Sequence, residues 1–347
     1  MLITILKIIP IFIALVIIYQ WARYASIKRI RYRRYFAQPG VFEGESVLLV
    51  EKIANTTLMP LFFVDVDAVL HNDLRLPGRR YGGMMQRYVS RFFLMPFTRV
   101  KRTVKIECVR RGYYELDTVS IYFFMKSVYA SSRAALHVYP RAVGCEESNP
   151  LETQMQNTER AEKRLLADPF SFSGVREYRP GDPFGSVNYK ATARTGVLKV
   201  NNRDFFSSRN YMIYIDFHTA SFFESIPTTV YGGLMEGALS YASDMVWKSV
   251  RSGYGVGFAA NCRMTGGAGS VRFPMRRGHD HYVEILREMA KIRTTPGNSF
   301  DWLIRQDVDA LWNADVYIMT VHGTEQITDL IEMLKVKGNH VSIIKLA

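Results

Sequence analysis

The chain has few cysteines and lacks the motifs that mark common enzyme and metal sites. Its 347 residues include three cysteines with no CxxC pair, namely Cys108, Cys145 and Cys262. Scattered cysteines in an odd number argue against a disulfide framework and against a structural zinc site. The sequence contains no Walker loop, no HExxH motif and no recognisable Ser-His-Asp order or paired carboxylates. We therefore expect a non-enzymatic protein that needs no cofactor.

Acidic residues are absent from the first 42 positions, where a long apolar run dominates. Residues 2–20 are apolar except for Thr4, Lys7 and Gln20. About 19 residues at ~1.5 Å each reach roughly 28 Å, close to the thickness of the hydrocarbon layer. The pattern predicts one transmembrane helix over residues 1–22. The alternative is a cleaved signal peptide, but the basic residues follow the apolar run instead of preceding it.

The segment over residues 23–36 is basic and carries interleaved aromatic residues. By the positive-inside rule it predicts a single-pass membrane protein with the bulk of the chain in the cytoplasm. We expect this segment to bind anionic lipids, so that much of the net charge of +13 serves the membrane and not nucleic acid. The predicted membrane-interface residues are Trp21, Arg23, Lys28, Arg29, Arg31, Arg33 and Arg34.

The rest of the chain predicts two folded parts. Short β-branched and aromatic runs over residues 37–143 are typical of an antiparallel β-sandwich. Residues 144–168 are polar and charged, which indicates a linker. Over residues 169–347, buried-type strands such as 210–216 alternate with amphipathic helices such as 228–253. This alternation predicts an α/β domain with a mainly parallel sheet, whose ligands would bind at the carboxyl ends of the strands.

The stretch "GVREYRPGDPFGSVNYKATARTG", residues 174–196, combines basic residues, carboxylates, prolines and glycines. Its simplest interpretation is a turn and a strand held by local ion pairs, because "RPGD" has the composition of a turn. The alternative is a partner-binding site.

This stretch resembles the signature of the bacterial domain-of-unknown-function 58 (DUF58) family, and the resemblance covers essentially the whole chain, including "RRGYYEL" and "VYPR". Gly185, Asn188 and Tyr189 depart from the usual pattern, so the chain looks like a divergent member. The matching positions, structural or partner-binding, are Arg176, Tyr178, Gly181, Asp182, Ala193 and Arg194, followed by Thr195, Gly196 and Leu198.

The resemblance implies a von Willebrand factor A-like fold for residues 169–347, which often holds Mg²⁺ in a loop after the first strand. Here that loop is "DFHTAS", in which Asp216 is present but His218 and Ala220 occupy the serine positions. Asn298 or Ser299 could replace the usual threonine, and "IMTVHGTE" offers no aspartate. Because Mg²⁺ needs several oxygen ligands, we expect a degenerate site and no bound metal.

The resemblance also implies a membrane-anchored scaffold protein, located in the bacterial inner (cytoplasmic) membrane. Its partners would be a MoxR-type AAA+ ATPase and other membrane or envelope proteins, in the assembly or maturation of protein complexes. Two alternatives remain open: a metal-dependent ligand-binding von Willebrand factor A protein, and a nucleic-acid-binding membrane protein that uses the basic stretch around "PMRRGHDHY".

Overall fold

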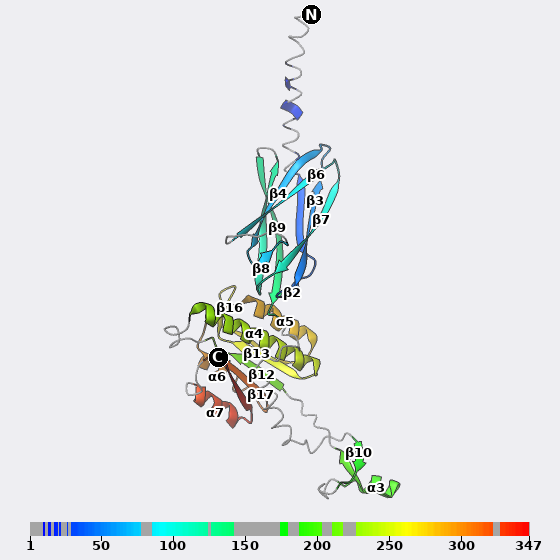
Figure 1. The fold of residues 1–347 in the computed structure, drawn as a ribbon, viewed down its shortest axis with the longest axis vertical. Helices are drawn as coiled ribbons and strands as arrows, with labels where there is room; N and C mark the ends of the chain where they lie inside the picture. The colour runs from blue at the N-terminus through cyan, green and yellow to red at the C-terminus, as the bar shows by residue number, and fades with distance from the viewer. Residues whose placement is uncertain are drawn as a thin grey trace, which may run out of the picture. The chain divides into compact units, whose positions relative to one another are not determined.

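The computed structural model forms two compact units (Figure 1). It describes residues 29–77, 85–123, 126–141, 174–179, 187–202, 210–217, 227–321 and 327–346, together with isolated positions between 10 and 26. The first unit comprises Met1–Ala142, Met264–Gly267 and Val283–Arg293. The second comprises Val143–Arg263, Ala268–Tyr282 and Thr294–Ala347.

The first unit contains two β-sheets that share one hydrophobic core. One sheet has the strand order β1 (Ile30–Phe36), β3 (Ser46–Asn55), β7 (Arg99–Cys108), β5 (Leu74–Arg75). The other has the order β2 (Gly40–Phe42), β9 (Lys126–Tyr139), β8 (Gly112–Phe123), β4 (Leu61–His71), β6 (Met85–Leu94). All pairings are antiparallel except that of β2 with β9.

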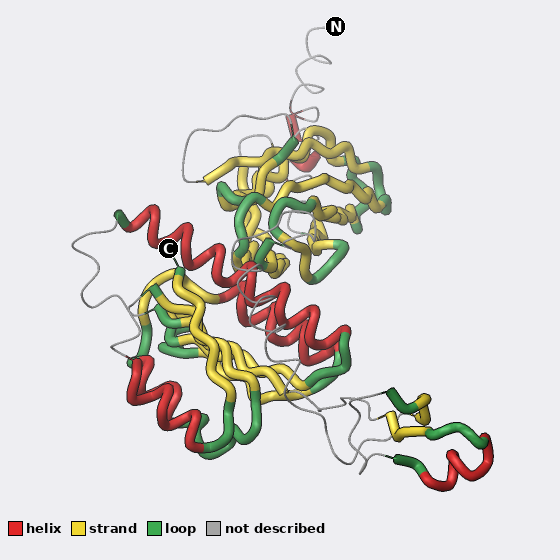
Figure 2. Tube along the Cα trace, turned by 60° about the horizontal axis from the view of Figure 1, so that its bottom comes forward, coloured by secondary structure: helices red, strands yellow, loops and turns green. Residues whose placement is uncertain are grey.

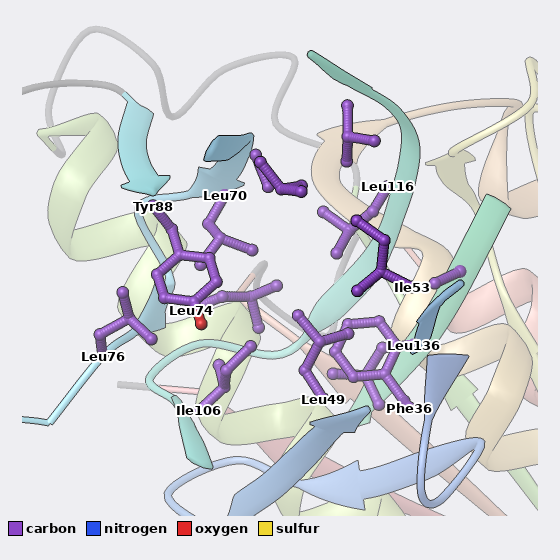
Figure 3. Packing of buried hydrophobic residues seen from close by; sticks show 14 of the residues in the cluster. Phe36, Leu49, Ile53, Leu70, Leu74, Leu76, Tyr88, Ile106, Leu116 and Leu136 are labelled. Atoms are coloured by element: carbon purple, nitrogen blue, oxygen red, sulfur yellow. The ribbon is translucent and has the colours of Figure 1, made fainter. Parts of the chain in front are cut away.

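Alternating side chains from both sheets build this core (Figure 3). On β3, Leu49 and Ile53 are fully buried, and Leu116 and Leu136 of the other sheet belong to the same cluster. Burying one such side chain contributes about 1.5–3 kcal/mol. The period-2 apolar pattern of these strands therefore places one face of each sheet inside.

The sandwich begins earlier than the sequence predicted, because β1 lies within the segment assigned to the membrane interface. In particular, the prediction that Arg34 binds lipid is wrong, since its side chain is 1% exposed. Its Nε donates to the carbonyl oxygen of Ser132 and its Nη2 to that of Thr118, each over 3.1 Å. Arg31 and Arg33 point outward on the same strand and are exposed.

Arg34 can donate to these two carbonyl oxygens because β8 and β9 change register between Leu116 and Thr118. A β-bulge interrupts the ladder of backbone hydrogen bonds and leaves carbonyl groups without their usual donors. The guanidinium of Arg34 supplies donors at that point. The Arg34 side chain therefore stabilises the inside of the sandwich. The sequence pattern alone had predicted that it binds lipid headgroups.

Several sequence predictions fall on residues outside the described ones. Most of the predicted transmembrane helix, Arg23, Lys28 and the linker over residues 144–168 are among them. Trp21 is exposed, and Arg29 lies in an exposed turn. In the described part of the chain, no helix is both long enough and apolar enough to cross a bilayer.

The second unit contains a five-stranded sheet. Its order is β15 (Val271–Arg276), β13 (Gly255–Ala260), β12 (Asn210–Ile215), β17 (Asp315–Thr320), β18 (His340–Lys345). The last four strands in this order are parallel, and β15 is an antiparallel edge strand. β12 and β13 are almost entirely buried, which agrees with their continuous apolar sequences.

Helices lie on both faces of this sheet (Figure 2). One face packs Met212, Tyr214 and Ile318 against α6 (Phe300–Arg305) and α7 (Thr328–Val336). The other face is covered by α4 (Thr228–Arg251). Because β13, β12, β17 and β18 are parallel, their carboxyl ends all lie on the same side of the sheet.

Two amphipathic stretches of the sequence are helical over only part of their length. Within residues 299–312, the helix ends at Arg305, and turns follow it. Within residues 279–293, the helix α5 (His279–Lys291) ends at Lys291. There the chain enters β16 (Ile292–Pro296), which pairs with β14 (Cys262–Met264). Two consecutive threonines favour that extended pairing over further helix.

Candidate functional site

The residues of the family-like motif form a small exposed module, the described residues of 174–202. β10 (Gly174–Glu177) pairs antiparallel with β11 (Lys199–Asn202), and Arg176 lies opposite Val200. Lys199 Nζ lies 3.3 Å from Glu177 Oε1 across the pair. Val187 and Val200 bridge each other and are buried. Gly181 and Asp182 lie outside the described residues.

The "ARTG" part of the motif, residues 193–196, forms the C-terminal end of a short helix, α3 (Tyr189–Thr195). The Asn188 side chain caps its start by accepting from the Ala191 N–H at 2.9 Å. Gly196 closes its end with a left-handed φ of 70°, and the Gly196 N–H donates to the carbonyl oxygen of Thr192. The Thr192 hydroxyl accepts from the Lys199 N–H at 3.0 Å, which joins the helix to β11. The "TG" of "ARTG" is therefore a helix C-cap, which favours glycine.

The surface of this module is cationic and partly apolar. Across residues 174–202 the sequence has five basic and two acidic side chains. Ala193 and Arg194 are exposed on α3, Arg176 and Arg179 are exposed, and Tyr178 is half-buried. Arg176 Nη1 donates to the carbonyl oxygen of Glu177 at 3.1 Å. Four large apolar side chains are exposed by 40–75%: Val175, Tyr189, Val197 and Leu198.

A second polar cluster lies at the carboxyl ends of the parallel strands. Asp216, which follows β12, is buried. Its Oδ1 accepts from Asn261 Nδ2 at 2.9 Å, and its Oδ2 accepts from the Thr320 hydroxyl at 3.4 Å. Asn261 follows β13 and Thr320 ends β17, so three neighbouring strands supply the three side chains.

The geometry of this cluster indicates a structural role for Asp216. The Asn261 Oδ1 accepts from the Phe217 N–H at 2.7 Å, and the Tyr231 hydroxyl of α4 donates to the Phe217 carbonyl oxygen. Burial, with a smaller effect of Asp216, raises the pKa of Tyr231, which keeps its proton available for that bond. Paired polar groups of this kind hold the strand ends together.

These residues do not fit a magnesium ion. Asp216 offers one carboxylate, whereas the amide nitrogen of Asn261 faces it and the amide oxygen is bonded to backbone. Mg²⁺ requires a near-octahedral set of oxygen ligands. The part of the chain that the structure describes holds no group of three or more His, Cys, Asp or Glu residues that could bind a metal. His218 and Ala220 lie outside it.

Sequence reasoning named Asp216 but missed its partners. Asn298, weighed as a substitute ligand, donates instead to the Ser270 hydroxyl, and Ser299 stands at the start of α6. Asn261 and Thr320 could have been found from their position alone. Each is a polar residue at the carboxyl end of a buried strand, where parallel strands bring their following residues together.

The second half of the chain is similar to known proteins. Residues 174–343 match the model of a family described as "Protein of unknown function DUF58". The Bacillus subtilis (strain 168) protein described as "Uncharacterized protein YeaD" is 22% identical over 174 residues, which cover 50% of this chain and 39% of that protein. The matched region therefore spans well under half the length of that relative.

Two solved structures show weak similarity to parts of the chain. The CARDB domain of PF1109 from Pyrococcus furiosus shares 11% identity at a TM-score of 0.24, over 31% of this chain and 94% of that one. The alkylpurine DNA glycosylase AlkC from Pseudomonas fluorescens shares 16% identity at a TM-score of 0.21, over 31% of this chain and 30% of that one. Scores this low carry no conclusion about fold or function.

Proposed function

Residues 174–343 of this chain belong to the DUF58 family, and on that premise we propose that the protein is a membrane-anchored scaffold that binds a protein partner through the 174–202 module. The partner class that the sequence resemblance implies is a MoxR-type AAA+ ATPase, in the assembly or maturation of envelope or other complexes. The bulk of the chain would lie on the cytoplasmic side of the inner membrane. The α/β unit would have a von Willebrand factor A-like fold that works without a bound metal.

The observation that carries this proposal is the exposed surface of the module. Exposed arginines beside a tyrosine and aliphatic side chains make a surface suited to protein recognition. Arginine binds carboxylates through two parallel hydrogen bonds, so the excess of basic residues favours an acidic partner surface. Tyr189, which is 75% exposed, supplies an aromatic anchor on the same short helix as Lys190 and Arg194.

The test is a charge reversal in the full-length chain. Arg194→Glu changes an exposed side chain in the last turn of α3, and Arg263→Glu changes an exposed side chain of β14 as a matched control. Each variant is crosslinked in solubilised membranes and its partners are quantified by mass spectrometry. We expect Arg194→Glu to weaken recovery of the main partner about tenfold, equivalent to about 1.4 kcal/mol, while Arg263→Glu retains it.

Equal recovery with both variants would contradict the assignment of the module as the binding surface. Circular dichroism of both variants controls for folding. Loss of an RNA or DNA species in place of a protein would support the nucleic-acid alternative.

A further inference from the structure

One end of the β-sandwich presents an apolar tip made of six exposed side chains. They come from the β3–β4 connection, the start of β4, the end of β6 and the β6–β7 connection. The exposed fractions range from 36% for Phe62 to 77% for Leu58. The tip consists of Leu58, Phe62, Phe63, Phe93, Met95 and Phe97. Contiguous exposed apolar side chains of this size mark interaction sites.

The fold holds these side chains outward at a cost in free energy. Phe63 and Phe97 have φ angles of 60° and 54°, in the left-handed region that bulky residues rarely adopt. β4 and β6 change register between Leu61 and Val64, and this irregularity exposes both Phe62 and Phe63 instead of alternating them. Strained backbone that persists in a well-packed surrounding points to function.

A single buried side chain ties the two connections together. Asn55 Nδ2 donates to the carbonyl oxygens of Met59 at 2.7 Å and Met95 at 3.1 Å. Its Oδ1 accepts from the hydroxyl of Thr57 at 2.7 Å. Phe63 and Phe93 pack edge to face, with ring centroids 5.1 Å apart. The tip is therefore a preorganised surface.

The chemistry around the tip favours an anionic lipid surface. The sequence contains no acidic residue over 52–64 or over 86–104, whereas Arg29, Arg31 and Arg99 are exposed at the same end. Register places them there, because Ile30 lies opposite Asn55 and Arg99 lies opposite Ala54. Apolar side chains flanked by cations suit the boundary between acyl chains and anionic headgroups.

Chain continuity points to the same occupant. The Thr56 hydroxyl, in the connection that carries Leu58, donates to the Arg29 carbonyl oxygen at 2.9 Å. Residues 21–28 alone separate the apolar run of residues 2–20 from Arg29. Whatever surface receives that run lies within reach of the tip.

We propose that the apolar tip of the sandwich inserts into the headgroup region of an anionic bilayer and forms a second membrane contact besides the N-terminal segment. This inference rests on the membrane association in the proposed function. The tip would seat the sandwich against the bilayer, with Phe97 and Leu58 below the phosphates and the arginines among them.

The test places an environment-sensitive fluorophore on the full-length chain. Phe97→Cys labels the tip. Val69→Cys labels β4 eight residues beyond Leu61, about 26 Å away along the strand, at a side chain that is also exposed. Cys145→Ser removes a native thiol, while Cys108 and Cys262 are buried. The labelled chains are reconstituted in phosphatidylcholine vesicles with about 30% phosphatidylglycerol, an anionic surface.

Lipids spin-labelled near the headgroup should quench the probe at position 97 at least about twofold more than at position 69, as expected for insertion by ~5–10 Å. Adding Leu58→Asp should reduce that quenching, and aqueous iodide should show the opposite order. Equal lipid quenching at both positions would overturn the proposal.

Two other outcomes separate this inference from the proposed function. A chain that does not float with the vesicles contradicts membrane association altogether. If the chain floats but iodide reaches position 97 freely, the result contradicts only the insertion of the tip into the bilayer. Protection of position 97 in native membranes but not in vesicles would identify a protein as the occupant and reject the lipid proposal.

Discussion

Arg34 shows how a single charged side chain can serve the interior of a fold. Burial lowers its pKa, and the nearby Tyr32 and Glu51 oppose that effect. Glu51 is fully buried and accepts from the hydroxyls of Tyr32 at 2.6 Å and Ser90 at 3.1 Å. Burial and Glu51 both raise the pKa of Tyr32, so its hydroxyl remains a donor. A polar network therefore joins the two sheets inside an otherwise apolar core.

Arg34→Met tests this network. The change leaves the Ser132 and Thr118 carbonyl oxygens without these donors. We expect a loss of about 2–3 kcal/mol in the local free energy of unfolding, seen as faster hydrogen exchange of β1, β8 and β9. Arg33→Met, on the exposed side of the same strand, should change it by less than about 0.5 kcal/mol. Equal effects of the two changes would show that charge, and not burial, determines the loss.

At the scale of elements, the motif segment is a hairpin joined to a short helix by side-chain caps. No residue of α3 is buried, so the helix has little packing to stabilise it. Short helices are marginal in water, and their end groups must be satisfied. The caps at Asn188 and Gly196 therefore hold α3 in place, and of these two residues Gly196 is the one that matches the family motif.

Gly196→Ala should destabilise α3 through backbone strain alone. An added Cβ meets nothing within 4 Å, but the φ of 70° disfavours any residue with a side chain. We expect a cost of about 1 kcal/mol and about fivefold less protection of the α3 amides in hydrogen exchange.

Gly233→Ala, in the interior of α4, is the matched control because its Cβ also meets nothing within 4 Å and its φ is not positive. It should leave α3 unchanged and stabilise α4 by up to about 1 kcal/mol. Unchanged α3 protection in Gly196→Ala would show that the helix does not depend on this cap.

At the scale of the whole molecule, charge is distributed unevenly along the chain. The first 42 residues carry no acidic side chain, while the net charge of +13 belongs to the entire sequence. Arg29, Arg31 and Arg33 remain exposed, whereas Arg34 is internal. The proposal of a membrane-anchored chain with a cytoplasmic body rests on this asymmetry.

Topology reporters on the full-length chain test that proposal. A reporter active only in the cytoplasm, fused at the C terminus, should be active, and the chain should stay in the membrane fraction after carbonate treatment. The physical reason is that the basic segment resists transfer while the apolar run partitions into the bilayer. A periplasm-only reporter that is active at the same position would contradict the orientation, and release by carbonate would contradict the span.

Local patterns were sufficient for many elements. A continuous apolar run predicted β12, and the amphipathic period predicted α4, because burial on both faces or on one face determines the spacing of apolar residues along the sequence. The motif residues and Asp216 could also be named from the sequence. Those predictions needed only neighbouring residues and their spacing.

Only the tertiary structure decided which distant residues meet. Arg34 looked like a lipid ligand until the register shift of β8 and β9 supplied its acceptors. Asn261 and Thr320 became partners of Asp216 only when three strands lay side by side. The apolar tip emerged from a bulge and two positive φ angles, which no period in the sequence encodes. The spacing of apolar residues in the sequence shows which positions are buried. The pairing between strands far apart in the chain determines the neighbours of each polar group.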